Sequence, residues 1–318
     1  FLEVLTNPLL LSALPHVIFA SYMVAGGLIA GISAWHLARP GVSEEDAATY
    51  RWATKFGAWV LIAGSALTFY TGDAQAKAIT QLQPSKIAAA EGAFEDTGDF
   101  SLLTLPNADQ TGTVVDIKVP NILSIIAGVP QIKGIDTIRE QYARHGYSLQ
   151  DGSQTKLQSQ YAEQLAGRYG GINPIPDVNV TYWSFRMMMV FGGLGLLIGI
   201  YLLWVIRKGR TPKPSKLWTT LMAAMPLLPL LGISFGWIFI EMGRQPWLVA
   251  GVMPTEAGIS PTTSAGDVLF SLIVYTLLYG LLAVIEVGLF LRYTAKGLPE
   301  VTEPKVSEDP DAPMSFAY

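Results

Sequence analysis

The sequence predicts an all-α fold: a polytopic bundle of transmembrane helices with one long extracytoplasmic loop. Half of the 318 residues are hydrophobic, only 14% are charged, and the mean hydropathy is +0.36. Charged residues this scarce are typical of integral membrane proteins. Apolar stretches of about 20 residues, the length that crosses a bilayer about 30 Å thick, recur along the chain. The composition therefore predicts a multi-pass membrane protein, and no nucleic-acid partner is expected.

Five apolar spans are long enough to cross the membrane. Tryptophans lie at the ends of the spans, as the aromatic belt at a lipid–water interface requires. The five spans cover residues 9–37, 52–71, 182–206, 217–242 and 268–293, and the tryptophans are Trp35, Trp52, Trp183, Trp204, Trp218 and Trp247.

Basic residues predict the orientation of these spans. The connection after the third span is strongly basic, and basic residues also flank the first connection and follow the fifth span, whereas the connection after the fourth span holds only Arg244. Because short basic loops stay in the cytoplasm, the N-terminus and the loop between spans two and three are expected outside. The basic residues after the third span are Arg207, Lys208, Arg210, Lys213 and Lys216.

The long loop between spans two and three is too elaborate for a simple connection, and loops of this length are usually functional or disordered. Helical patterns occur at residues 135–145 and 156–169. A short apolar stretch at 121–129 is flanked by prolines, cannot span, and is expected on the surface. The predicted organisation is two transmembrane helices (1–71), the loop (72–180), three transmembrane helices (181–297) and a disordered cytoplasmic tail (298–318).

The rarer residue types limit the chemistry. The chain contains no cysteine, which excludes disulfides, iron–sulfur clusters and haem bound through thiolate or thioether. Three histidines, His16, His36 and His145, are too few for a copper–haem oxygen site.

His16 and a run of three methionines are expected at the same depth in the membrane. His16 lies about seven residues into the first span, or roughly 10 Å from the outer side. Met187, Met188 and Met189 lie at about that depth in the third span. A histidine and a methionine facing each other are the axial ligands of one class of low-spin haem. In the competing interpretation, the histidine makes a structural hydrogen bond and the methionines pack in the core. Arg186, just before the run, is either a partner for a haem propionate or an interfacial anchor.

The fourth span ends in ionisable residues. Trp237, Glu241 and Arg244 are spaced i, i+4, i+7, which places them on one helical face. Ionisable residues at membrane depth are costly and usually face a partner, a cavity or a cofactor. The alternative is a Glu–Arg pair that anchors the helix at the interface.

The beginning of the long loop holds a second candidate site. A helix that starts after Pro84 would place Lys86 and Glu91 near one another at the membrane surface. A lysine and a carboxylate there could hydrogen-bond a quinol and accept its protons. From spacing alone, a solvated capping pair is the favoured interpretation.

Four stretches together resemble subunit I of the cytochrome bd quinol oxidases. Two are long and specific: GWIFIEMGRQPW at residues 236–247, and GDAQ followed by QPSKIAAAEG within residues 72–92. The others are Arg-Met-Met at 186–188 and the histidine at 16. These stretches are spread over almost the whole chain.

The resemblance implies roles for particular residues. His16 and Met188 match the axial ligands of a low-spin b haem, and Arg186 matches the basic residue beside it. Glu241 matches the carboxylate ligand of one haem of a high-spin pair, with Trp237 and Arg244 beside it. Lys86 and Glu91 match the quinol-oxidising residues of the external loop, called the Q-loop in this family.

The resemblance also implies a reaction. Quinol is oxidised at the outer face, electrons pass through the low-spin b haem, and a high-spin pair of haem b and haem d reduces O2 to water. Proton motive force arises without pumping. The implied setting is the lipid bilayer of the bacterial inner (cytoplasmic) membrane, and the implied partner is cytochrome bd subunit II, with or without small accessory subunits. Whether Glu241 binds the b or the d haem, and whether the quinol is ubiquinol or menaquinol, stays open.

The family subunit has about nine transmembrane helices, and the five spans here match the last five. The chain begins at Phe1 rather than at an initiator methionine, so a truncated chain is expected. On this view it holds the low-spin haem and half of the high-spin site, and is inactive in oxygen reduction without the remaining helices.

Two other classes compete with an oxidase. The first is a b-haem membrane anchor of another quinol-linked dehydrogenase, but such anchors usually use paired histidines, and only His16 is well placed within a span. The second is a transporter without redox chemistry that uses Glu241, Arg244 and Glu286 for ion coupling. Absence of haem from the purified protein would favour the transporter.

Overall fold

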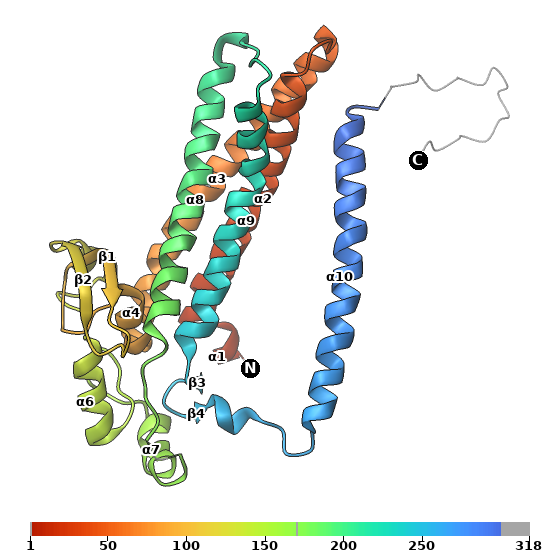
Figure 1. The fold of residues 1–318 in the computed structure, drawn as a ribbon. Helices are drawn as coiled ribbons and strands as arrows, with labels where there is room; N and C mark the ends of the chain where they lie inside the picture. Colours follow the sequence, from red (N-terminus) through yellow and green to blue (C-terminus); the bar gives the residue numbers. More distant parts are fainter. Residues whose placement is uncertain (1, 170, 300–318) are drawn as a thin grey trace. The chain divides into compact units, whose positions relative to one another are not determined.

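The fold is described from a computed structural model in which residues 2–169 and 171–299 are placed (Figure 1). The chain forms two compact units, Phe1–Thr263 and Ser264–Tyr318, and each is described by itself. The first unit contains the short α1 (Leu2–Leu5), four long helices and the loop region; the second contains one long helix.

The long helices of the first unit are α2 (Pro8–Leu37), α3 (Glu44–Leu82), α8 (Val178–Ile206) and α9 (Lys216–Arg244). Side-chain oxygens begin all four: Asn7, Ser43, Asp177 and Ser215 each accept a hydrogen bond from an N–H of the first helical turn. Prolines inside helices are confined to α2 and α9 among the described residues.

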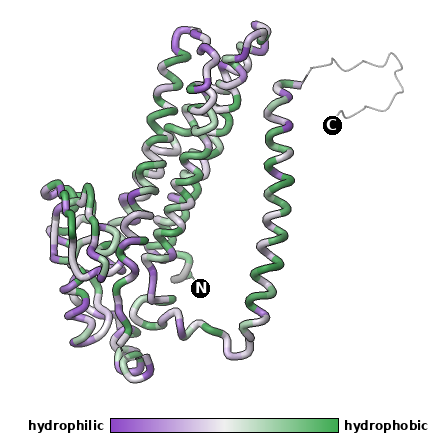
Figure 2. Tube along the Cα trace, in the orientation of Figure 1, coloured by the Kyte–Doolittle hydropathy of each residue, from purple (hydrophilic) through white to green (hydrophobic). Residues whose placement is uncertain are grey.

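Among the described residues, four helices are long and apolar enough to cross a membrane: α2, α8 with the following turn η1 (Arg207–Gly209), α9 and α10 (Ala265–Lys296). Figure 2 shows hydrophobic residues along these helices and hydrophilic residues in the loop region. The second predicted span lies within α3, which is long enough but has an acidic first turn and a more polar sequence, and is not among the four. The multi-pass helical fold is confirmed, and the second span stays a prediction.

Small residues bring the helices of the first unit close together. A Cβ on Gly27 of α2 would lie 2.5 Å from the Met225 carbonyl oxygen of α9, and a Cβ on Gly57 of α3 would lie 2.5 Å from the Ala30 nitrogen of α2. Backbones can approach this closely only where the side chain is a hydrogen atom. The core of this bundle also holds Leu61, which is fully buried.

The loop region is an ordered structure. The helical patterns at 135–145 and 156–169 are confirmed as α6 (Ile135–His145) and α7 (Lys156–Arg168). A further helix, α4 (Pro84–Glu91), begins at Pro84 as expected. The expectation that stretch 121–129 lies on the surface is wrong in part: it forms α5 (Ile122–Ala127), whose Leu123 and Ala127 are buried in one apolar cluster with Ile79 and Ile87.

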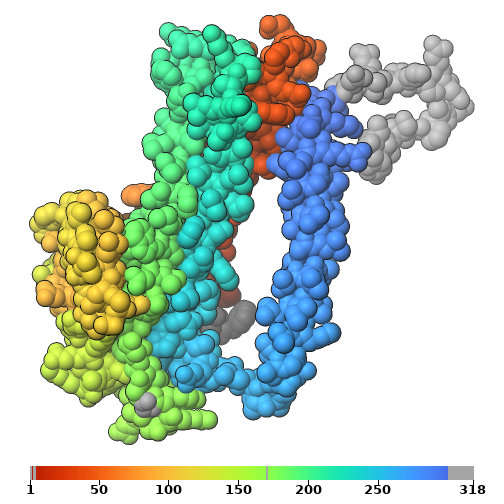
Figure 3. Space-filling view, viewed as in Figure 1, coloured from red at the N-terminus to blue at the C-terminus, as the bar shows by residue number. Residues whose placement is uncertain are grey.

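Two antiparallel strands, β1 (Phe100–Pro106) and β2 (Thr113–Val119), form a hairpin that was not predicted from the sequence. The turn is closed by Asn107, whose N–H donates to the Gly112 carbonyl at 2.9 Å. The register shifts between Ser101 and Leu103, as at a β-bulge. In Figure 3 the hairpin, in yellow, lies directly against α8, in green.

The remaining elements are small. After α9, strands β3 (Trp247–Val249) and β4 (Met253–Pro254) pair, and the turn η2 (Thr255–Gly258) follows. In the second unit, a capping box of Ser264 and Asp267 begins α10. The disordered tail predicted for 298–318 lies outside the described residues except for its first two.

Candidate functional site

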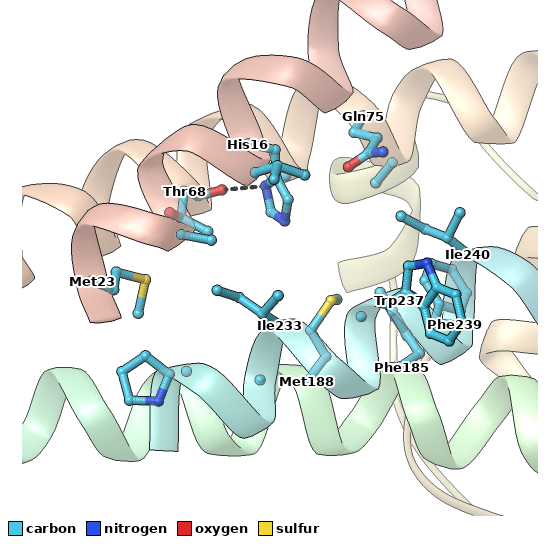
Figure 4. A pocket seen from close by; sticks show the side chains of 18 of the residues that line it. His16, Met23, Thr68, Gln75, Phe185, Met188, Ile233, Trp237, Phe239 and Ile240 are labelled. Carbon is cyan, nitrogen blue, oxygen red and sulfur yellow. Dashed lines mark hydrogen bonds between the residues drawn. The ribbon is translucent and has the colours of Figure 1, made fainter. Parts of the chain in front are cut away.

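An apolar cavity of about 240 Å³ lies between α2, α3, α8 and α9 (Figure 4). His16 of α2 and Met188 of α8 both line it, and the figure shows their side chains pointing into it from opposite walls. The rest of the lining is almost entirely apolar. The matched depth expected for these two residues therefore corresponds to a shared cavity. The other lining residues include Met23, Phe185, Ile233, Trp237, Phe239 and Ile240.

The hydrogen bonds of His16 leave one ring nitrogen available. Nδ1 lies 3.0 Å from the Thr68 carbonyl oxygen. A carbonyl can only accept, so Nδ1 carries the proton and Nε2 has a free lone pair. This orientation by a backbone carbonyl is typical of a histidine that binds a metal through its other nitrogen.

Glycines keep both walls of the cavity open. A Cβ on Gly72 would lie 3.1 Å from Cε1 of His16, and a Cβ on Gly236 would lie 2.9 Å from Sδ of Met188. Both imidazole and thioether therefore have space that a larger side chain would fill.

The donor set of the cavity fits a low-spin haem. An imidazole nitrogen and a thioether sulfur are a known pair of axial ligands, and the apolar walls suit the macrocycle. Within residues 2–169 and 171–299, no group of three or more His, Asp or Glu side chains could hold a metal ion. A haem does not require such a group, because the macrocycle supplies the equatorial ligands of its iron.

A buried ion pair joins the loop region to α8. Arg186 Nη2 donates to Glu91 Oε2 at 2.8 Å and to the Ser101 carbonyl at 2.9 Å. The two side chains are only 9% and 2% exposed. Burial raises the pKa of Glu91, and the Arg186 guanidinium opposes that rise. Arg186, expected beside the methionine run, is therefore held by the loop residue expected to oxidise quinol.

The guanidinium of Arg186 also contacts three aromatic rings and has one N–H without an acceptor in the described part of the chain. Its carbon lies 4.7 to 5.2 Å from the ring centres of Phe100, Tyr182 and Phe185. Its buried Nε has no hydrogen-bond partner within the described part of the chain. One donor of this cation is therefore unsatisfied, although Arg186 is not among the residues that line the cavity of His16 and Met188.

Lys86 faces a different helix from Glu91, although both lie on α4. Its Nζ donates to the Ile240 carbonyl of α9 at 3.4 Å and lies 4.8 Å from the ring centre of Phe239. Burial lowers the pKa of Lys86 to about 8, and the nearby positive charge of Arg244 adds to this effect. The predicted helix is confirmed, but Lys86 and Glu91 point to α9 and α8 respectively rather than to each other.

Glu241 and Arg244 form an ion pair at the end of α9. Both are about one-third exposed, and neither lines the cavity of His16 and Met188. Trp237, the third member of the predicted face, lines that cavity and is otherwise exposed. The predicted face thus divides between the cavity and a separate charged pair.

Three polar residues beside the buried ion pair were not predicted from the sequence. Ser101 and Thr104 of β1 and Tyr182 of α8 are all fully buried and hydrogen-bonded to one another. Tyr182 precedes Arg186 by one helical turn, and this spacing could have identified it. Serine and threonine in an unpredicted strand gave no comparable signal.

Comparisons with known proteins identify the family of this chain. The family model for cytochrome bd terminal oxidase subunit I matches residues 1–298. Cytochrome bd ubiquinol oxidase subunit 1 of Bacillus subtilis (strain 168) is 32% identical, with 93% of this chain and 59% of that protein covered. Cytochrome bd-II ubiquinol oxidase subunit 1 of Escherichia coli (strain K12) is 29% identical, with coverages of 93% and 64%.

Solved structures show the same fold. The structure of bd oxidase from Geobacillus thermodenitrificans superimposes with a TM-score of 0.70 at 24% identity, covering 93% of this chain and 60% of that one. The chain spans about three-fifths of the length of the curated relatives it matches. With a family model that covers nearly all of its residues, this chain belongs to the cytochrome bd terminal oxidase subunit I family.

Proposed function

We propose that this chain is the quinol-oxidising part of subunit I of a cytochrome bd-type terminal oxidase. The observation that carries the proposal is the cavity in which a free imidazole nitrogen of His16 faces the thioether of Met188. The proposed location is the bacterial cytoplasmic membrane, and the proposed partner is a second oxidase subunit. The relatives are named as ubiquinol oxidases, which supports quinol as the electron donor.

His16 and Met188 would hold a low-spin b haem. Bound there, the haem supplies one-electron transfer. The available Nε donor of Arg186 would bind an acidic group at its edge, and Gly72 and Gly236 would leave room for it. Glu241 would bind one haem of a high-spin pair, of b or d type, with Arg244 beside it.

Lys86 and Glu91 would bind the quinol and accept its protons. With a pKa of about 8, Lys86 exchanges a proton close to neutral pH, which suits general acid–base work. Glu91 is buried and held in one orientation by Arg186, so its carboxylate is preorganised to accept a proton. Protons released at this outer layer, while oxygen reduction consumes protons from the inside, would generate proton motive force without pumping.

The test is a difference spectrum of the purified complex, dithionite-reduced minus air-oxidised. His16→Ala should remove the low-spin b-haem band and leave other haem bands in place. His145→Ala, an exposed histidine on α6, is the matched control and should leave every band unchanged. A wild-type complex without haem bands, or a His16→Ala variant that retains its low-spin band, overturns the proposal.

A further inference from the structure

A line of hydroxyl groups runs from Tyr182, beside the buried ion pair, to Asp116 on β2 of the hairpin. Tyr182 OH lies 3.0 Å from Ser101 Oγ, and Ser101 Oγ lies 2.6 Å from Thr104 Oγ1. Thr104 Oγ1 then donates to Asp116 Oδ1 at 2.9 Å. We refer to Ser101, Thr104 and Asp116 as the relay, with Tyr182 at its inner end.

Counting hydrogens fixes the direction of these bonds. Thr104 Oγ1 donates to Asp116 Oδ1, so the single hydroxyl proton of Thr104 points to that oxygen. Ser101 must then donate to Thr104, and Tyr182 must donate to Ser101. Tyr182 accepts from the Thr104 N–H at 2.8 Å, which satisfies its remaining bond. Every hydroxyl proton therefore points away from the ion pair and towards Asp116.

The β-bulge makes this arrangement possible. In a regular strand Ser101 and Thr104 would lie on opposite faces, because side chains alternate. The register shift between Ser101 and Leu103 turns both hydroxyls to the same buried side, while Leu102 is exposed. The irregularity thus aligns two hydroxyls that a regular strand would separate.

The relay has a proton source at one end and solvent at the other. At the inner end, the Ser101 N–H donates to Glu91 Oε2 at 3.4 Å, so the carboxylate lies beside the residue that begins the relay. At the outer end, the Asp116 side chain is 27% exposed and paired with Lys118 at 2.8 Å. Ser101 and Thr104 are fully buried between them.

We propose that the relay carries the proton that Glu91 accepts from quinol to the outer surface, with Ser101 and Thr104 as relay residues, Asp116 as the terminal acceptor and Tyr182 as a positioning residue. This inference rests on the proposed quinol oxidation. At each hydroxyl one O–H bond breaks as another forms: Glu91 gives a proton through one bridging water to Ser101 Oγ, Ser101 to Thr104, and Thr104 to Asp116, which releases it to water. Rotation of the two hydroxyls restores the starting state, and no electrons move along the relay.

The experiment measures quinol turnover in the whole oxidase complex, in H2O and in D2O. Thr104→Val keeps the shape of the side chain and removes its hydroxyl. We expect maximal turnover to fall about tenfold or more, the quinol KM to stay unchanged, and the solvent isotope effect to rise. Thr104→Ser should restore both turnover and isotope effect. Thr113→Val, an exposed threonine on β2, should behave as wild type.

A second variant covers the case in which Thr104→Val does not fold. Asp116→Asn, at the surface, keeps an oxygen acceptor for Thr104 but cannot take up the proton, so turnover should again fall with KM unchanged. Wild-type turnover and isotope effect in both Thr104→Val and Asp116→Asn overturn the relay and leave the proposed function intact. A wild-type complex that binds haem but does not oxidise quinol overturns both.

Discussion

At the scale of single residues, Glu91 and Arg186 place two opposite charges in the interior, where little of either side chain is exposed. Two charges buried together offset each other, but either one alone has no compensation for its lost hydration. The Ser101 backbone contacts both members, through its carbonyl and its N–H. Each charge therefore compensates the free-energy cost of burying the other.

Arg186→Met should lower stability by about 3 kcal/mol, because it leaves the Glu91 carboxylate buried and unpaired. Thermal unfolding of the purified complex measures the loss. Arg144→Met is the control: Arg144 pairs with Glu140 on an exposed face of α6, where an ion pair contributes little, so its effect should be near zero. Equal losses in the two variants would contradict the argument.

The loss should depend on pH with a definite sign. The pKa of Glu91 in the folded protein is raised by burial, and Arg186→Met raises it further by removing the opposing guanidinium. A carboxyl group with a raised pKa binds more protons when folded than when unfolded, so stability falls as pH rises above the ordinary carboxyl range. Arg186→Met should therefore lose more stability at pH 8 than at pH 5. A larger loss at pH 5 would show that the carboxylate is not the cause.

At the scale of helices, Gly27 of α2 and Gly236 of α9 have different roles. A Cβ on Gly27 would meet the Met225 carbonyl, which belongs to the backbone of α9 and cannot easily move. A Cβ on Gly236 would meet only the flexible thioether of Met188. The first glycine permits helix packing, and the second leaves space for a side chain in the cavity.

Gly27→Ala should therefore lower the free energy of unfolding by about 1–3 kcal/mol, and the unfolding temperature with it. The haem spectrum of the complex that remains folded should be unchanged. Gly236→Ala should do the reverse: unchanged unfolding and an altered low-spin band. Gly193→Ala serves both measurements as control, because its added Cβ meets no atom of the described residues within 4 Å. The same pattern from Gly27→Ala and Gly236→Ala would refute the distinction.

Helices could be predicted from the sequence because their signals are local. Long apolar runs gave α2, α8, α9 and α10, and Pro84 gave the start of α4. The hairpin could not be predicted, because its strands are seven residues long and one carries a bulge. Of the site, the shared position of His16 and Met188 followed from matched depth, and their role as haem ligands stays a prediction from family resemblance. The pairing of Glu91 with Arg186, 95 residues apart, has no local signature.

At the scale of the whole molecule, the orientation in the membrane is the prediction with the widest consequence, since it decides to which side protons are released. The absence of cysteine makes it directly measurable. Lys156→Cys on α7 should react with a membrane-impermeant maleimide from outside intact cells. Lys213→Cys, between α8 and α9, should react only after the membrane is opened. The parent chain should stay unlabelled, and the opposite pattern would invert the assignment.

Arg186 also donates to the Ser101 carbonyl, so this hydrogen bond connects the start of β1 to α8. The same guanidinium has an Nε–H without an acceptor in the described part of the chain. A ligand that binds the guanidinium and shifts it breaks the hydrogen bond to the Ser101 carbonyl. Deuterium uptake by the backbone amides of β1 would therefore report whether a ligand is bound at Arg186. Mass spectrometry measures this uptake and requires neither a chromophore nor turnover. The hairpin would exchange faster when Arg186 is engaged elsewhere, and slower when it returns.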